Sequence, residues 1–219
     1  MLPLRDDIPS SKKPVVTYTI VAINVIVFLY EMSLGRGLQS FVISYGVTPE
    51  HIVSGNSFFT LITSMFIHGD FWHILGNMLF LWIFGDNVED ALGKFWFIVM
   101  YFLAGIGGSV AHILVSQNSA IPTIGASGAI SGVLGAYLIL YPRARVLAVV
   151  PIIFFIRFIM LPAYVFLGIW IFLQLFLGVG STAGGAGVAY FAHIGGFVVG
   201  LLFGFMFKKK QQRFSYEIY

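Results

Sequence analysis

The stretch TIGASGAISG, which runs from Thr123 to Gly132, begins an apolar helix and places a serine among small residues. Gly128, Gly132 and Ala136 recur every four residues, so they lie on one face of that helix. Small residues at this spacing let two helices approach closely inside a membrane. The stretch therefore predicts a tight helix contact, and it leaves Ser127 with either a packing role or a chemical one.

The composition of the chain indicates an integral membrane protein. Of its 219 residues, 58% are hydrophobic and only 10% are charged, and the mean hydropathy is +0.93. This is too little polar surface to cover a water-soluble globule. Cysteine is absent, which excludes disulfides, thiol nucleophiles and thiolate metal sites.

Six apolar runs have about the length that crosses roughly 30 Å of hydrocarbon. They are Val15 to Leu34, His73 to Gly85, Phe95 to Val115, Ala126 to Tyr141, Phe158 to Leu177 and Ala189 to Phe207. We therefore expect an all-α membrane protein, a compact bundle of six transmembrane helices with a long membrane-associated first loop. The expected domains are a cytoplasmic arm at 1–14, a six-span domain at 15–207 and a basic cytoplasmic tail at 208–219.

One apolar segment does not fit a span. The run between Arg143 and Arg157 is too short to cross the bilayer and contains Pro151, so we expect an interfacial or re-entrant connection there.

The basic residues predict the orientation of the chain. With six spans and both termini inside, all but one of the lysines and arginines fall on the cytoplasmic side, and only Arg36 falls outside. This matches the positive-inside rule. We expect a multi-pass protein of the plasma membrane with both termini cytoplasmic. The segments Gly35 to Trp72, Ser116 to Gly125 and Leu177 to Gly187 then face out, and the composition of the last favours an ordinary loop over a flexible cap.

Several polar residues lie inside the expected spans, where each costs free energy unless it is paired. They are Asn24, Asn77, His73, His112, Ser127, Ser131, Gln174 and His193. For any one of them alone, a packing or interface role is the more common one.

A second stripe of small residues changes this view for Ser127. In the sixth span Ala192, Gly196, Gly200 and Gly204 recur every four residues, and His193 follows the first of them. We expect the two stripes to pack together. Counting helical rise from the basic residues at the inner ends puts Ser127 and His193 about 24 and 22 Å above that level. They therefore share one depth in the outer half of the bilayer.

A serine beside a neutral histidine is the minimum arrangement for an activated nucleophile, because the imidazole accepts the hydroxyl proton. Attack on a carbonyl also creates an oxyanion, which needs hydrogen-bond donors. His73 and Asn77 are four residues apart and share a helix face, and Gly125 lets the backbone amide of Ser127 turn toward a substrate. No acidic residue lies at this depth to orient His193. We therefore expect a dyad of serine and histidine instead of a triad.

Three motifs in this order on alternate spans resemble the rhomboid family of intramembrane serine proteases. They are HILGN from His73 to Asn77, GASG from Gly125 to Gly128 and AHIGG from Ala192 to Gly196. The resemblance covers nearly the whole chain. It implies that Ser127 is the nucleophile, that His193 is the general base, and that Asn77 and His73 form the side-chain part of the oxyanion hole.

The resemblance also implies a membrane-embedded loop at Gly35 to Trp72. It further implies a lateral gate, formed by the fifth span and the segment after it, through which a substrate helix approaches. The implied partners are transmembrane protein substrates and the lipid bilayer, with cleavage of single-span proteins near the outer face. No cofactor, metal or nucleic acid is expected.

Two positions depart from the pattern of the family. Phe59 and Thr60 stand where members often have a Trp-Arg pair, so the first loop is expected to be anchored differently. Ser131 stands one turn after the nucleophile, where members often carry an aromatic residue that stacks on the histidine. Hydrogen bonding or other packing would then hold His193.

Other classes of protein fit less well. A zinc protease would need a His-Glu-x-x-His pair, and an aspartyl protease two intramembrane aspartates, whereas Asp86 and Asp90 fall at the inner edge. A transporter or channel would spread polar residues through both leaflets. The main alternative is a rhomboid-like protein that binds membrane helices without cutting them, but such a protein would not need both Ser127 and His193.

Overall fold

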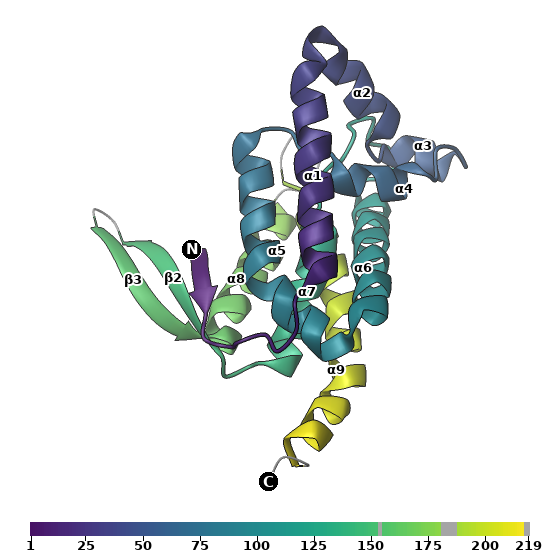
Figure 1. Ribbon diagram of the computed structural model, residues 1–219. Helices are drawn as coiled ribbons and strands as arrows, with labels where there is room; N and C mark the ends of the chain where they lie inside the picture. Colours follow the sequence, from purple (N-terminus) through teal and green to yellow (C-terminus); the bar gives the residue numbers. More distant parts are fainter. Residues whose placement is uncertain (153–154, 181–187, 217–219) are drawn as a thin grey trace.

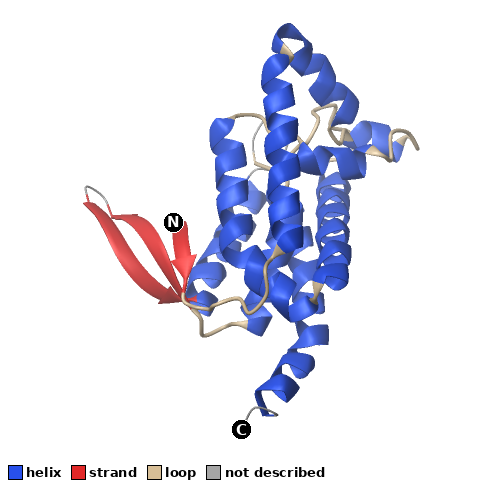
Figure 2. Cartoon of the chain, viewed as in Figure 1, coloured by secondary structure: helices blue, strands red, loops and turns tan. Residues whose placement is uncertain are grey.

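The structure is a computed structural model that describes residues 1–152, 155–180 and 188–216, with side chains for 1–150, 155–180 and 188–208. Figure 2 shows a bundle of helices with one small sheet at its side. The long helices are α1 (Val15–Ser33), α5 (Phe71–Leu92), α6 (Lys94–Val115), α7 (Ser127–Leu140), α8 (Ala163–Gly180) and α9 (Tyr190–Tyr216). Residues 181–187, most of the expected outer segment from Leu177 to Gly187, lie outside the described residues.

Four of these helices are long and apolar enough to cross a membrane, namely α1, α6, α8 and the Tyr190–Lys208 part of α9. Helix α7 is apolar but has 14 residues, and α5 has 22 residues and carries Asp86, Glu89 and Asp90 near its end. The chain is thus a mostly helical, multi-pass membrane protein. Length and composition do not confirm the count of six spans.

The predicted contact between the two small-residue stripes is present. A Cβ added at Gly196 would overlap the carbonyl oxygen of Gly128, and one added at Gly200 would overlap that of Gly132. The backbones of α7 and α9 therefore touch directly. Helix α7 lies at the centre of the bundle, where nearly all of its side chains are buried.

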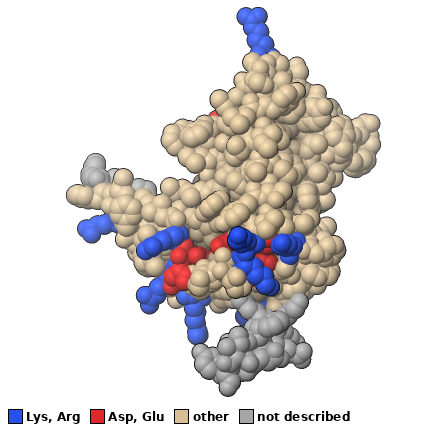
Figure 3. All heavy atoms as spheres, viewed as in Figure 1, with Lys and Arg blue, Asp and Glu red and all other residues tan. Residues whose placement is uncertain are grey.

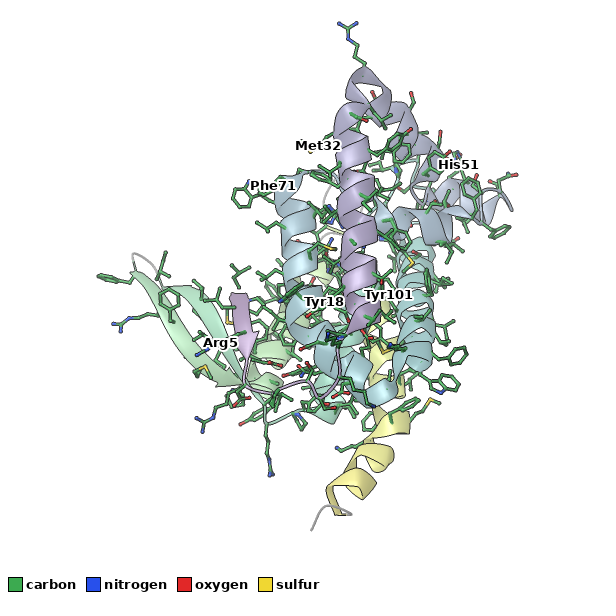
Figure 4. The ribbon with its side chains drawn as sticks, in the orientation of Figure 1. Arg5, Tyr18, Met32, His51, Phe71 and Tyr101 are labelled. Carbon is green, nitrogen blue, oxygen red and sulfur yellow. The ribbon has the colours of Figure 1, made fainter. Side chains whose placement is uncertain are left out.

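The outer surface of the bundle is apolar, as lipid contact requires. Met32 projects outward from α1 and Phe71 from α5, and both side chains are more than half exposed (Figure 4). The same holds for Phe172 and Phe176 on α8.

A three-stranded antiparallel sheet lies beside the lower end of the bundle in the view of Figure 1. Strand β2 (Arg145–Ile152) pairs with β3 (Phe155–Pro162), and β1 (Leu2–Asp6) pairs with the other edge of β2. The connection after α7, which was expected to be interfacial or re-entrant, contains β2 and β3. One expectation was wrong: the fifth helix begins at Ala163 instead of Phe158. The segment is rich in Val, Ile and Phe, which favour strands. Its Pro151 lies beyond the part of β2 that pairs with β1, Val146 to Val149, so among the described residues that side of β2 is a sheet edge there, where a strand tolerates proline.

Carboxylates at the lower end of the bundle fasten the N-terminal arm. Glu89 of α5 accepts hydrogen bonds from the backbone amides of Val16 (3.0 Å) and Thr17 (2.8 Å), so it caps the start of α1. Asp90 accepts from the amide of Ser11 at 2.8 Å. Figure 3 shows Lys and Arg side chains gathered around the same end of the molecule.

A second contact at this end joins the sheet to the bundle. The hydroxyl of Tyr137 in α7 donates a hydrogen bond to the carboxylate of Asp6 in β1. Burial raises the pKa of Asp6 to about 6. The arm is therefore part of the packed structure and not a free tail.

The first loop folds into short helices at the opposite end. They are η1 (Gly35–Gly37), α2 (Leu38–Tyr45), α3 (Pro49–Val53), α4 (Thr60–Thr63) and η2 (Ser64–Phe66). At the position of the missing Trp-Arg pair, the ring of Phe59 packs edge-on against Tyr45, with centroids 6.3 Å apart. The Thr63 hydroxyl donates to the carbonyl oxygen of Tyr45 at 2.7 Å. These contacts anchor α4 to α2.

Candidate active site

Ser127 is the first residue of α7, where the amides of a helix have no partner within the helix. Gly125, two residues earlier, has a φ of +123°, and its amide donates to the carbonyl oxygen of Ser64 at 2.9 Å. This contact ties the start of α7 to the first loop. The Ser127 amide therefore lies at a helix N-terminus, where it is available to an oxyanion.

The structure brings His193 to Ser127. His193 lies in the first turn of α9, and its Nε2 atom is 2.8 Å from Ser127 Oγ. Close contact between the stripes of α7 and α9 makes this approach possible, since no side chains separate the two backbones. A hydroxyl and an imidazole at this distance can exchange a proton.

Two residues of α8 hold the other side of the imidazole, and the sequence did not identify either role. The Nδ1 atom of His193 is 2.7 Å from Gln174 Oε1. The ring of Trp170 lies 5.9 Å from the His193 ring, centroid to centroid, with 33° between the planes. Trp170 and Gln174 are four residues apart and therefore share a helix face. A glutamine one turn from a tryptophan in an apolar helix was the signal available in the sequence.

Ser131 does not support the imidazole. Its hydroxyl donates to the carbonyl oxygen of Ser127 at 2.6 Å, within α7. The aromatic support that the sequence lacks at Ser131 is provided by Trp170.

Asn77 of α5 lies beside this pair with a free donor. Its side chain is 8% exposed, and its Nδ2 has no hydrogen-bond partner among the described residues. A buried amide without a partner costs free energy. The geometry therefore leaves a donor that a bound oxyanion can satisfy.

His73, one turn before Asn77, has its ring next to Gly125. A Cβ added at Gly125 would lie 2.8 Å from His73 Nε2 and 3.6 Å from Ser127 Oγ. The Gly69 amide donates a long hydrogen bond of 3.4 Å to His73 Nδ1. If Nδ1 accepts, the neutral ring carries its proton on Nε2, the atom that lies next to Gly125. Asp70 caps the helix by accepting from the His73 amide at 3.0 Å and so fixes the start of α5.

The four residues expected at the site, Ser127, His193, Asn77 and His73, line a single cavity of about 1180 Å³. Trp170 and His112 line it as well, whereas Gln174 lies behind the imidazole. Of the other polar residues in the spans, Asn24 lies outside the cavity, and its Nδ2 donates to the carbonyl oxygen of Ile20 at 2.8 Å.

Comparison with known proteins shows to which family the chain belongs. A family model for the rhomboid domain matches residues 55–210. The chain belongs to the rhomboid family. The matched range contains α5 to α9 apart from the tip of α9, and with them every residue of the cavity described above.

Curated relatives agree with this assignment. This rhomboid is 31% identical to Rhomboid protein 1, mitochondrial, of Saccharomyces cerevisiae, over 90% of the chain and 54% of that protein. It is 34% identical to Rhomboid protease GluP of Bacillus subtilis, over 58% of the chain and 24% of that protein. RHOMBOID-like protein 12, mitochondrial, of Arabidopsis thaliana is 30% identical over 71% of the chain and 48% of that protein. The chain thus spans about half the length of these relatives or less.

The relatives bear on the expected location. Two of these three are mitochondrial by name and the third is bacterial. The comparisons therefore support a multi-pass membrane protein but not the plasma membrane in particular.

Proposed function

We propose that this rhomboid is an intramembrane serine endopeptidase that cleaves single-span membrane proteins near the outer face of the membrane. The observation that carries the proposal is the 2.8 Å contact between His193 Nε2 and Ser127 Oγ, in a cavity that also contains Asn77 and His73. The protease name of the relative from Bacillus subtilis supports it.

In this mechanism Ser127 Oγ attacks the scissile carbonyl carbon while His193 Nε2 accepts the hydroxyl proton. The tetrahedral intermediate collapses to an acyl-enzyme, and His193 gives the proton to the leaving amine. Water then attacks the ester carbonyl, with His193 again taking a proton. Release of the acid restores the Ser127 hydroxyl.

Three donors would bind the oxyanion. The Ser127 amide belongs to the unpaired first turn of α7, Asn77 Nδ2 has no partner among the described residues, and His73 Nε2 lies next to Gly125, two residues before Ser127. Loss of one donor of this kind costs about 100- to 1,000-fold in turnover. Several donors together make up a large part of the catalysis.

The proposal includes an orientation and a domain division. Six spans between 15 and 207 put both ends of the chain on one side, the arm at 1–14 and the tail at 208–219. Arg36 in η1 lies just after the C-terminal end of α1, whereas the arm leads into its N-terminal end. By the positive-inside rule, the end of the bundle that carries the three-stranded sheet would face the cytoplasm or the equivalent compartment. A substrate helix would then reach Ser127 from the opposite leaflet.

The second candidate is a rhomboid-like protein that binds membrane helices without cutting them. A binding role alone gives no reason for an unpaired Asn77 donor next to a hydrogen-bonded serine and histidine. The two candidates differ in whether a covalent intermediate forms.

The deciding experiment incubates the purified protein, in liposomes, with a panel of single-span membrane proteins. Cleavage and covalent labelling by a fluorophosphonate are expected, and Ser127→Ala is expected to abolish both. Labelling without cleavage of any panel member would point to a narrower substrate range. A Ser127→Ala protein that cleaves as fast as the parent would refute the mechanism.

A further inference from the structure

Behind the imidazole of His193 lies a hydrogen-bond acceptor that the mechanism above does not use. Gln174 of α8 places its Oε1 atom 2.7 Å from His193 Nδ1. We propose that Gln174 is a positioning residue, which fixes the tautomer and orientation of His193 so that Nε2 can accept the Ser127 proton. This inference rests on the proposed protease function.

The amide group of Gln174 has one orientation that satisfies both of its neighbours. Its Nε2 lies 3.5 Å from the carbonyl oxygen of Trp170, which can only accept. With the amide nitrogen facing Trp170 and the amide oxygen facing His193, both neighbours are satisfied. The neighbours of the side chain on α8 thus determine which end of it meets the imidazole.

An amide oxygen accepts hydrogen bonds and cannot donate them. His193 Nδ1 must therefore carry the ring proton, which leaves the lone pair of Nε2 toward Ser127 Oγ, 2.8 Å away. Without the acceptor, the neutral ring can carry its proton on either nitrogen. A proton on Nε2 would turn His193 from a base into a donor and stop the attack.

Gln174 determines which ring nitrogen carries the proton, and Trp170 restricts how the ring of His193 can rotate. Its side chain packs at 33° to the imidazole plane, which limits rotation about the Cβ–Cγ bond of His193. Gln174 and Trp170 thus act on the same ring from one helix face. The expected dyad of serine and histidine would thus be supported by a neutral third residue, Gln174, which orients the ring without adding charge.

The two supports come from a helix that carries neither Ser127 nor His193. The buried side chains of α8 are mostly near its start, at Ala163, Phe166 and Leu167, whereas its later residues Phe172, Leu175 and Phe176 are exposed. The orientation of His193 therefore depends on how the loosely packed second half of α8 lies against α9.

The test compares two substitutions of Gln174 that differ in whether an acceptor remains at the position of its Oε1 atom. Gln174→Met keeps the length of the side chain but removes the acceptor, and Gln174→Glu keeps an acceptor oxygen at the same place. Leu175→Met, an exposed neighbour on α8, is the matched control. The readouts are kcat and KM for a cleaved panel substrate in liposomes, the rate of fluorophosphonate labelling, and the midpoint of thermal unfolding.

Gln174→Met is expected to lower kcat and the labelling rate at least about 10-fold, with KM and the unfolding midpoint nearly unchanged, because only ring orientation is lost. Gln174→Glu should recover kcat to within about 3-fold of the parent, and Leu175→Met should match the parent. The inference is overturned by parental kcat in Gln174→Met, or by a loss that Gln174→Glu does not recover and that accompanies a lower unfolding midpoint. Failure of the protease function itself would be distinct, since the parent would then neither cleave a panel substrate nor take up the fluorophosphonate label, or Ser127→Ala would do both as fast as the parent.

Discussion

Gly200 of α9 lies against the carbonyl oxygen of Gly132 in α7 so closely that no Cβ fits between them. The same relation holds one turn earlier, between Gly196 and Gly128. Backbone contacts thus set the spacing of the helices that carry Ser127 and His193.

Substitution at this contact should therefore affect both stability and activity. Gly200→Ala is expected to destabilise the fold by about 1 to 3 kcal/mol or more, because the added methyl group meets backbone that cannot rotate away. Thermal unfolding in detergent measures this. Gly168→Ala in α8 is the matched control, since a Cβ there meets nothing within 4 Å, and helix propensity predicts a small gain. Equal unfolding midpoints for the two variants would contradict the packing described.

The oxyanion donors can be separated from the base. Asn77→Ala should lower kcat by about 100- to 1,000-fold and leave measurable cleavage, because other donors remain. His73→Ala should resemble it, whereas His193→Ala should fall below detection. Steady-state cleavage rates in liposomes provide the comparison. A His73→Ala protein as inactive as Ser127→Ala, next to an active His193→Ala protein, would make His73 the base.

Asp6 predicts a dependence of stability on pH. Burial raises the pKa of Asp6 from 3.8 to about 6 in the folded protein, so the folded state binds this proton more tightly than the unfolded state. The contribution of Asp6 to stability therefore falls as the pH rises from about 4 through 6.

Asp6→Asn keeps an oxygen that can accept from Tyr137 but cannot ionise. The unfolding midpoint of Asp6→Asn relative to the parent should therefore be higher at pH 7.5 than at pH 5. Thermal scans of both proteins at the two pH values check this. A difference that is the same at both pH values would show that Asp6 does not titrate in this range.

The orientation can be tested with single cysteines, because the native chain has none. Lys12→Cys lies in the N-terminal arm and Gln117→Cys between α6 and α7, and both positions are exposed. A thiol reagent that cannot cross the membrane should label Gln117→Cys from the outside and Lys12→Cys only after the membrane is opened. Labelling of both positions from the same side would reject the six-span arrangement.

Local sequence patterns predicted the part of the fold that brings Ser127 and His193 together. A repeat of small residues every four positions is a property of one helix, and it specifies a close contact whatever the rest of the chain does. The depths of the two residues followed from helical rise alone. The pair His73 and Asn77 was likewise visible as one helix face.

The sheet and the support of His193 could not be predicted in the same way. The segment that forms β2 was interpreted only as an apolar run too short to cross the bilayer. Its pairing depends in part on β1, which is far away in the sequence. For Trp170 and Gln174, a rotation of α8 about its axis decides which side chains meet His193. That rotation depends on packing between helices, so the sequence of α8 alone does not determine it.

The pairing of β1 also has a consequence for the order in which the protein assembles. Asp7 accepts a hydrogen bond from the Arg145 amide, 138 residues further along the chain. At a synthesis rate of 5–20 residues per second, the N-terminal strand waits roughly 7 to 28 s for its partner to leave the ribosome. Strand β1 is thus fixed well after it is made, and a chain that stalls before β2 would expose an unpaired strand edge to chaperones and proteases.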